Sequence, residues 1–163
     1  MHTDYEDVLE LPDGEEPTPE NLFNHAFIDI GGRWPEAEPT IMEDPQYAME
    51  YAWLVIDGRW PEAEPTIMQD PEYAYQYAQY IIEGRWPEAE PTIMQDPRSA
   101  CYYAEYVIIE GRWPEAEPHI MKVPRWACYY AEHVIDGRWP EAEPYIMKDP
   151  TTWGKYRKHF GIS

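Results

Sequence analysis

The chain has 163 residues, of which 44% are hydrophobic and 15% are aromatic, and its formal net charge at pH 7 is −20. The aromatic content argues against an intrinsically disordered chain despite the acidity, and the length suits one domain. No apolar run is long enough to cross a membrane, and the first residues lack the basic and apolar regions of a signal peptide, so we expect a soluble intracellular protein.

The charge is spread unevenly along the chain. Residues 1–31 contain nine acids and no Lys or Arg, whereas residues 145–163 have a balance of +3. Residues 1–17 have no repeat register and little apolar content, so we expect this acidic segment to be flexible or only loosely docked. The remaining residues, 18–163, are expected to form a single repeat domain.

An octapeptide, "GRWPEAEP", occurs five times, with spacings of 26, 26, 27 and 26 residues. A fixed period in this range predicts a stacked array of supersecondary units. We therefore predict an all-α fold, an α-solenoid of about 26-residue repeats with six longer helices joined by five short elements. Its parts are a capping helix over 19–31, repeats over 32–149 and a basic C-terminal capping helix over 150–160. The octapeptides begin at Gly32, Gly58, Gly84, Gly111 and Gly137.

The longer helices carry clear start and stop signals. Thr18 is the expected N-cap of the first, degenerate helix, and an Asp-Pro pair opens most of the others, with Asp as the N-cap and Pro at the first helical position. The glycines of the octapeptides are expected to close the helices as left-handed C-caps. The capping acids are Asp44, Asp70, Asp96 and Asp149, and the closing glycines are Gly58, Gly84, Gly111 and Gly137.

Inside each longer helix, two alanines stand four residues apart and therefore share one face. Small residues there allow a neighbouring helix to approach closely. A tyrosine precedes the second alanine, and we expect it to pack with its polar tip at the surface. The alanine pairs are Ala48/Ala52, Ala74/Ala78, Ala100/Ala104 and Ala127/Ala131, and the tyrosines are Tyr51, Tyr77, Tyr103 and Tyr130.

The stretch between the longer helices holds two prolines four residues apart, which one continuous helix cannot accommodate. We expect an irregular or 3₁₀ turn over "WPEAE", then a short helix, with Ile41 and Met42 and their equivalents beneath the longer helices and each octapeptide Trp buried against the next unit. In "YVIIEG", Ile108 and Ile109 are expected to lengthen the fourth longer helix by one residue through a local bulge. The short helices begin near Pro39, Pro65, Pro91, Pro118 and Pro144.

The residues that usually carry chemistry form no recognisable motif. Phosphate-binding, dinucleotide-binding, zinc-protease and C-x-x-C patterns are all missing from the sequence, so we expect neither an enzyme nor a cofactor or metal. Cys101 and Cys128 hold the same place in neighbouring repeats, where helices about 8–10 Å apart hold them too far apart for a disulfide, so both are expected to be reduced core residues. The histidines are scattered, and His119 and His133 are interpreted as surface residues that could lie close together.

Ten glutamates of the octapeptides form two potential acidic rows. Acids in a first helical turn complement the helix dipole, and the single Arg of each octapeptide can pair with one Glu, which leaves one row for a partner. A calcium site is disfavoured, because the pairs lack an oxygen-rich loop, and direct binding of nucleic acid is disfavoured because phosphate would be repelled. The rows are Glu36, Glu62, Glu88, Glu115 and Glu141, and Glu38, Glu64, Glu90, Glu117 and Glu143.

The acidity also permits a DNA mimic. Five steps give a rod of about 40–50 Å, over which duplex DNA carries roughly 24–29 charges, and residues 1–144 have a balance of −23. One continuous acidic stripe would favour mimicry, whereas acids spread around an apolar groove would favour a repeat scaffold that binds a protein through its concave face.

The pattern "DPxxAxxYAxxVIxGRWPEAEPxI", present here as "DPEYAYQYAQYIIEGRWPEAEPTI", resembles a 26-residue repeat found in tandem in bacteriophage-encoded proteins. The match covers roughly residues 19–150 and identifies the repeat without indicating an activity. The resemblance implies a viral origin and a location in the cytoplasm of an infected bacterium. It favours an inhibitor of a host defence or nucleic-acid-processing protein, with the repeat scaffold as the alternative. The solenoid itself is expected to be a monomer or homodimer.

Overall fold

A computed structural model describes residue 9, residues 11–109 and residues 111–163. All the regular structure in these residues is helical, as predicted, and the chain divides into two compact units, Met1–Gln69 and Asp70–Ser163. The boundary between the units falls between two helices inside the repeat array that the sequence assigns to one domain. Each unit is therefore described by itself.

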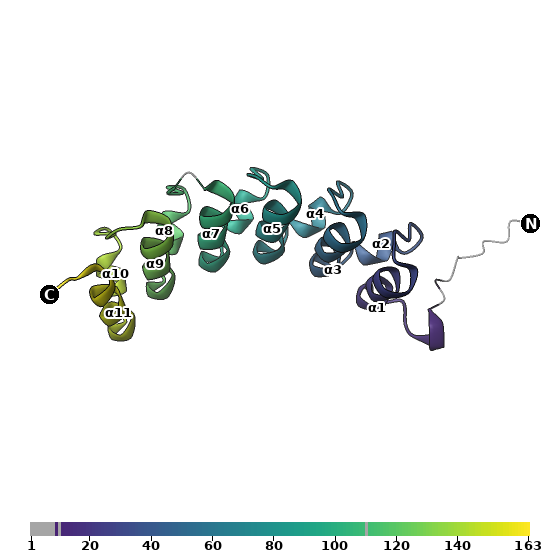
Figure 1. The fold of residues 1–163 in the computed structure, drawn as a ribbon, viewed down its shortest axis with the longest axis horizontal. Coiled ribbons are helices and arrows are strands. Elements are labelled where there is room, and N and C mark those ends of the chain that lie inside the picture. The colour runs from purple at the N-terminus through teal and green to yellow at the C-terminus, as the bar shows by residue number, and fades with distance from the viewer. Residues whose placement is uncertain (1–8, 10, 110) are drawn as a thin grey trace, which may run out of the picture. The chain divides into compact units, whose positions relative to one another are not determined.

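The first unit contains two longer helices, each an α-helix that continues into a π-helical last turn, and two short helices. In Figure 1 each longer helix is followed by a short one. A 3₁₀ turn, Pro12–Gly14, precedes them. The elements are α1 (Pro19–Asn24) with its π turn His25–Ile30, α2 (Glu38–Ile41), α3 (Pro45–Tyr51) with its π turn Ala52–Ile56, and α4 (Glu64–Ile67).

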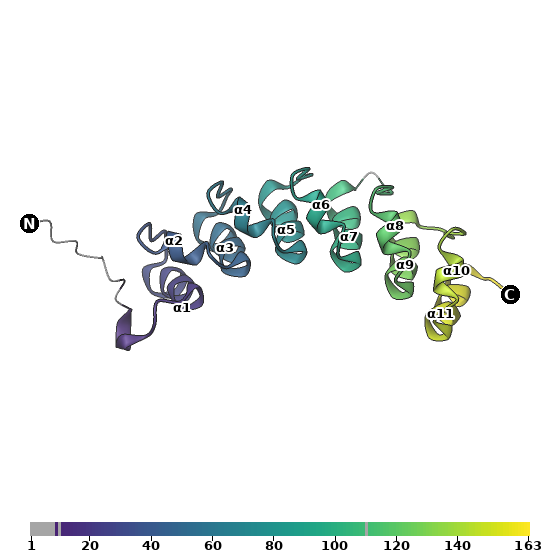
Figure 2. The same ribbon diagram turned by 180° about the vertical axis from the view of Figure 1, so that it is seen from behind.

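The second unit repeats this alternation, and its last helix is regular to its end. The longer helices α5, α7, α9 and α11 pack each on the next, and a short helix joins each to its successor, as the view from behind also shows (Figure 2). The elements are α5 (Pro71–Tyr77) with π turn Ala78–Ile82, α6 (Glu90–Ile93), α7 (Pro97–Tyr103) with π turn Ala104–Ile108, α8 (Glu117–Ile120), α9 (Pro124–Tyr130) with π turn Ala131–Ile135, α10 (Glu143–Ile146) and α11 (Pro150–Phe160).

The predicted helix starts are confirmed. Thr18 accepts a hydrogen bond from the Asn21 N–H, and each capping Asp accepts at least one backbone N–H of its own first turn. Val123 occupies this place at the start of α9 and offers no side-chain acceptor there. The short helices begin one residue before the expected proline, and a turn of three residues precedes each, in agreement with the irregular "WPEAE" segment.

The predicted helix ends were wrong by one residue. The left-handed residue is the acid before the glycine, namely Asp57, Glu83 and Asp136, rather than Gly58, Gly84 or Gly137. The cause is the π turn: the N–H of Asp57 already bonds to the Ala52 carbonyl, five residues back, and the N–H of Gly58 bonds to the same carbonyl at 3.1 Å. This wide turn completes the reversal one residue earlier than the regular helix end that the prediction assumed.

The extra residue of the third full repeat does not lengthen its helix, contrary to expectation. The π turn after α7 ends at Ile108, in register with the others, and the insertion is taken up in the connection, where Ile109 (φ 59°) and Gly111 (φ 115°) both have positive φ. Ile109 is 77% exposed. A β-branched residue at positive φ is strained, so the connection absorbs the insertion at an energetic cost while α8 keeps its place in the repeat.

The core consists of small and aromatic side chains at repeated positions. The paired alanines, the isoleucines of the short helices and the tryptophans of the later octapeptides are buried, whereas Met42 is only half-buried. Cys101 and Cys128 are buried free thiols, as predicted, and burial raises the pKa of Cys128 to about 12. The prediction that the tyrosine hydroxyls reach the surface was wrong. The four side chains are fully buried, and their hydroxyls lie in the core: Tyr51, Tyr77, Tyr103 and Tyr130.

The acidic N-terminal segment lies mostly outside the described residues, which omit 1–8 and 10. Leu11, which belongs to it, is buried, and a 3₁₀ turn follows. No helix in the described part of the chain is both long and apolar enough to cross a membrane.

Candidate protein-binding surfaces

The second glutamate of each octapeptide is held by the arginine of the same octapeptide. Arg33 Nε donates to Glu38 Oε1 at 2.8 Å and its Nη2 donates to Glu38 Oε2 at 2.9 Å, and the other four octapeptides repeat this two-bond pairing. The five carboxylates are only 11–13% exposed. In the last octapeptide, the hydrogen bond from Arg138 lowers the pKa of Glu143.

Within each unit, buried tyrosine hydroxyls join an octapeptide to the longer helix that follows it. Within the second unit, Tyr103 Oη accepts the Trp86 N–H at 2.7 Å and donates to Glu90 Oε1 at 2.9 Å. The same pair of bonds, from a tryptophan backbone N–H and to the second glutamate of the preceding octapeptide, is made by the hydroxyls of Tyr51, Tyr130 and Tyr156. Burial is the main cause that raises the pKa of Tyr51 to about 12. The second row of glutamates therefore belongs to the fold.

The octapeptide tryptophan packs on both sides of its repeat. The Trp113 ring lies 5.0 Å from the Tyr103 ring of the helix before it, and the backbone N–H of Trp113 donates to Tyr130 Oη of the helix after it. Arg112 of the same octapeptide lies 5.8 Å from the ring centroid of Trp139. The expected contact with the following longer helix is thus made by the tryptophan backbone, and the ring itself contacts the tyrosine of the preceding longer helix.

The first glutamate of every octapeptide is exposed. In the described part of the chain, their carboxylates accept no hydrogen bond and form no ion pair. Glu62 nevertheless lies close enough to Arg33 to raise the pKa of that arginine, and Glu141 acts in the same way on Arg112. The sequence could not say which glutamate of each pair would remain available. The exposed ones are Glu36, Glu62, Glu88, Glu115 and Glu141.

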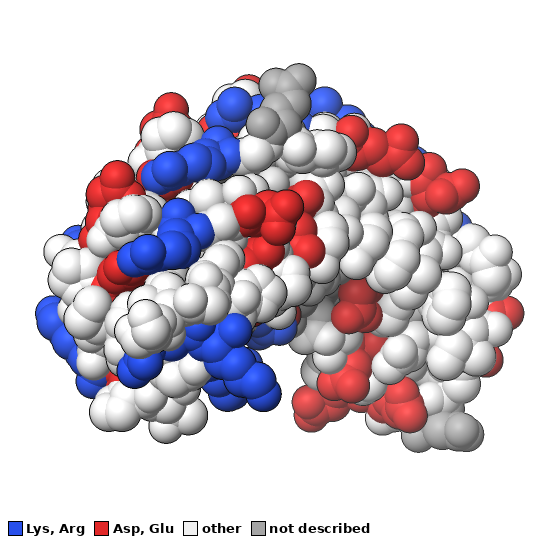
Figure 3. Space-filling view, turned by 60° about the vertical axis from the view of Figure 1, so that its left-hand side comes forward, with Lys and Arg blue, Asp and Glu red and all other residues white. Residues whose placement is uncertain are grey.

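The charge of each connection is modest compared with that of a nucleic acid. The connection after α3 carries Asp57, Arg59, Glu62 and Glu64, a balance of −2. Duplex DNA carries about five or six charges over the roughly 8–10 Å that separates packed helices. On the face in Figure 3, Lys and Arg side chains also lie close beside Asp and Glu, with broad areas of other residues between them.

A second surface, missed by the sequence reasoning, lies on the longer helices of the second unit. Ring contacts of 5.6–5.8 Å join Tyr102 of α7 to Tyr75 of α5 and to Trp126 and Tyr129 of α9. His133 stacks on Tyr129 at 4.2 Å. We call this the aromatic surface. The sequence does contain a signal for this surface, because Tyr102 and Tyr129 occupy the same position of neighbouring repeats. The position is not aromatic throughout the array, since the earlier repeats have Glu50 and Gln76 there.

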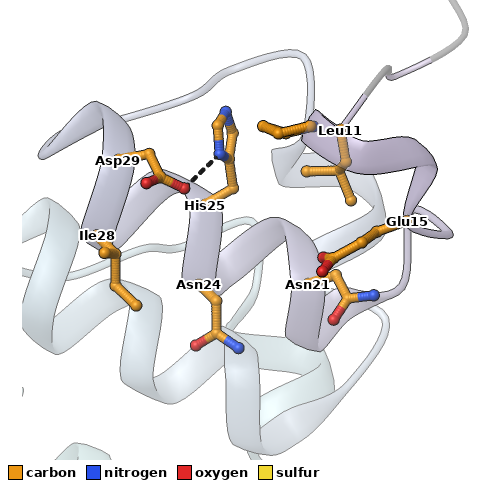
Figure 4. A pocket seen from close by; sticks show the side chains of 8 residues that line it. Leu11, Glu15, Asn21, Asn24, His25, Ile28 and Asp29 are labelled. Carbon is orange, nitrogen blue, oxygen red and sulfur yellow. Dashed lines mark hydrogen bonds and ion pairs between the residues drawn. The ribbon is translucent and has the colours of Figure 1, made fainter.

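The first unit has an open pocket of about 470 Å³ at its N-terminal end, between the 3₁₀ turn and α1 (Figure 4). His25 stands in the repeat position of Tyr51, and its Nδ1 lies 2.7 Å from Asp29 Oδ2. Leu11 and Ile28 also line the pocket. It is thus the place that an earlier octapeptide would occupy, partly covered by residues 11–15.

No group of His, Cys, Asp and Glu side chains in the described part of the chain is arranged to hold a metal ion. No protein-family model, curated protein or solved structure matches the chain. The assignment of a function therefore depends on the surfaces themselves.

Proposed function

We propose that the chain is a non-enzymatic repeat protein that binds a basic host protein through its exposed octapeptide glutamates and blocks that protein's nucleic-acid-binding surface. The observation that carries the proposal is that the two glutamates of each octapeptide differ in exposure and in pairing. One glutamate is largely buried and paired with an arginine, and the other is exposed at the same place in every repeat. A repeated exposed carboxylate suits a partner with several positive charges.

The distribution of charge supports the first unit as the stronger attractant for such a partner. Residues 1–69 contain 17 Asp and Glu against two Arg, whereas residues 70–163 contain 15 acids and ten Lys and Arg. The balances are −15 and −5. A strongly charged surface accelerates association with an oppositely charged partner and makes it sensitive to salt. The resemblance to phage-encoded repeats makes a bacterial nucleic-acid-binding protein the expected partner.

Mimicry of DNA is the finer form of this proposal. The connections carry about a third of the charge density of a duplex, so their contribution is attraction to basic side chains rather than a copy of the phosphate spacing. Competition between the chain and duplex DNA for one partner is the property that mimicry requires. A repeat scaffold is the second candidate, and the observation that favours it is the aromatic surface, because Tyr and Trp are residue types enriched in binding hot spots.

The test is capture of a partner from bacterial lysate by the purified chain, followed by measurement of the captured protein's affinity. We expect the double variant E36Q/E62Q to bind more weakly and salt to weaken the wild-type complex steeply, because exposed charges are screened over about 8 Å at physiological ionic strength. Duplex DNA should displace the chain from the partner.

The matched control is E16Q/E43Q, which removes two exposed carboxylates of the same unit from outside the octapeptides. If both variants lose affinity equally, the octapeptide row has no special role and only net charge matters. If E36Q/E62Q binds as tightly as the wild type and DNA does not compete, the proposal is wrong and the scaffold function takes its place.

A further inference from the structure

The aromatic surface contains a carboxylate in an unusual setting. Glu105 lies at the start of the π turn after α7, and its side chain is 19% exposed. Tyr129 Oη, from α9, donates to Glu105 Oε2 at 2.6 Å. Burial, helped by hydrogen bonds to Glu105 and Tyr106, raises the pKa of Tyr129. One phenol, from the neighbouring longer helix, thus holds the carboxylate in place.

Glu105 differs from the octapeptide carboxylates of similar burial. Each of those carboxylates, 11–13% exposed, accepts two hydrogen bonds from an arginine. The potential cation near Glu105 in the described structure is His133, whose Nδ1 is 4.0 Å from Oε1 and which is charged only when protonated. A carboxylate can accept about four hydrogen bonds, so Glu105 keeps room for a charged donor.

The rings around Glu105 suit a guanidinium group. Tyr106 is 46% exposed, and the His133 ring stacks on Tyr129 beside the carboxylate. A guanidinium is planar, stacks on aromatic faces and donates two parallel hydrogen bonds to a carboxylate, whereas an ammonium does neither as well.

The same surface already holds two guanidinium groups of the chain itself. Arg98 lies 5.8 Å from the Tyr102 ring centroid and Arg125 lies 5.2 Å from that of Trp126. Arg98 also pairs with Glu72 at 3.3 Å, so ring and carboxylate together bind one arginine on this surface.

We propose that Glu105, with the rings of Tyr106, Tyr129 and His133, receives an arginine side chain of a partner protein. This inference rests on the proposed function in one respect, namely that the partner is basic. It places a specific anchor at the end of α9 and on the π turns that follow α7 and α9, apart from the octapeptide glutamates. It also names arginine rather than lysine as the residue recognised. The occupant completes the arrangement that the octapeptide arginines make within the fold.

The experiment is an NMR titration of the full chain with the capped tripeptide Gly-Arg-Gly at about 0.15 M salt, where long-range attraction is screened beyond about 8 Å. We expect saturable shifts of the Tyr106, Tyr129 and His133 side-chain signals. Binding should weaken roughly three- to tenfold with citrulline in place of arginine and with Glu105→Gln, as expected for loss of one cation–π and ion-pair anchor. Tyr106→Leu, at an exposed position, should weaken binding similarly without unfolding the chain.

The matched control is Glu132→Gln, because Glu132 takes the place of Glu105 in the next repeat and accepts from the Cys128 thiol instead of a tyrosine. It should bind the peptide like the wild type. Equal binding of the citrulline peptide, or unchanged binding by both Glu105→Gln and Tyr106→Leu, would overturn the assignment. Neither outcome changes the result of the capture experiment with E36Q/E62Q. Failure of this assignment can therefore be distinguished from failure of the proposed function.

Discussion

Removal of a single buried hydroxyl, by Tyr103→Phe, is expected to destabilise the second unit strongly. The hydroxyl accepts the Trp86 N–H at 2.7 Å and donates to Glu90 Oε1 at 2.9 Å, and both Tyr103 and Trp86 are buried. A buried donor left without a partner costs about 1–3 kcal/mol, and a hydrogen bond to a charged group contributes about 1.5–3 kcal/mol. Because Glu90 keeps both bonds from Arg85, the second loss falls near its lower limit. We expect a total of about 2.5–4.5 kcal/mol.

The assay for this variant is urea unfolding followed by circular dichroism, with the midpoint compared at equal slope. Tyr145→Phe is the control, because Tyr145 is half-buried and the contact of Lys148 Nζ with its ring, 4.8 Å from the centroid, survives in Phe. The control should change the free energy of unfolding by less than about 0.5 kcal/mol. A loss this small in Tyr103→Phe would refute the role given to the tyrosine hydroxyls.

Three further changes have defined outcomes. Val123→Asp should stabilise α9 by about 1 kcal/mol in the same urea assay, because it supplies the missing cap acceptor; no gain would contradict the capping argument. Ile109→Gly should stabilise the chain by about 1 kcal/mol, because it relieves a positive φ of 59° at a β-branched residue; a destabilised variant would show that this backbone is unstrained. The Arg138 hydrogen bond lowers the pKa of Glu143, so the ionised Glu143 carboxylate stabilises the folded chain. This stabilisation is complete above about pH 4.3, the ordinary pKa of Glu, and is lost as the pH falls through the lowered pKa. A pH series of melting temperatures should therefore show less acid sensitivity in Glu143→Gln than in the wild type, and identical profiles would contradict the shift.

Local chemistry was sufficient to predict the repeat frame. The Asp-Pro pairs, the alanine spacing and the double proline of the octapeptide each act within one turn of chain, and the structure confirms the elements they indicate. The helix ends were misplaced because the π-helical last turn shifts the reversal from Gly58 to Asp57, and nothing in the local sequence distinguishes these two reversals.

The features that the sequence did not reveal depend on contacts between repeats. The Tyr103 hydroxyl bonds to groups 13 and 17 residues away, so no local pattern predicts that its tip is buried. For the same reason the sequence offered two glutamates per octapeptide without choosing between them. The setting of Glu105 was hidden because its tyrosine partner lies 24 residues further along the chain.

The central claim is that the two glutamates of each octapeptide have different roles, and thermal unfolding of two triple variants tests it most directly. Glu88, Glu115 and Glu141 are exposed, whereas Glu90, Glu117 and Glu143 each hold an arginine. Replacing either set by Gln removes three charges from the same unit. We predict that the first triple variant melts within about 2 °C of the wild type and that the second melts at least about 5 °C lower, since 1 kcal/mol corresponds to about 2–4 °C in a chain of this size. Equal melting temperatures for the two variants would contradict the division of roles.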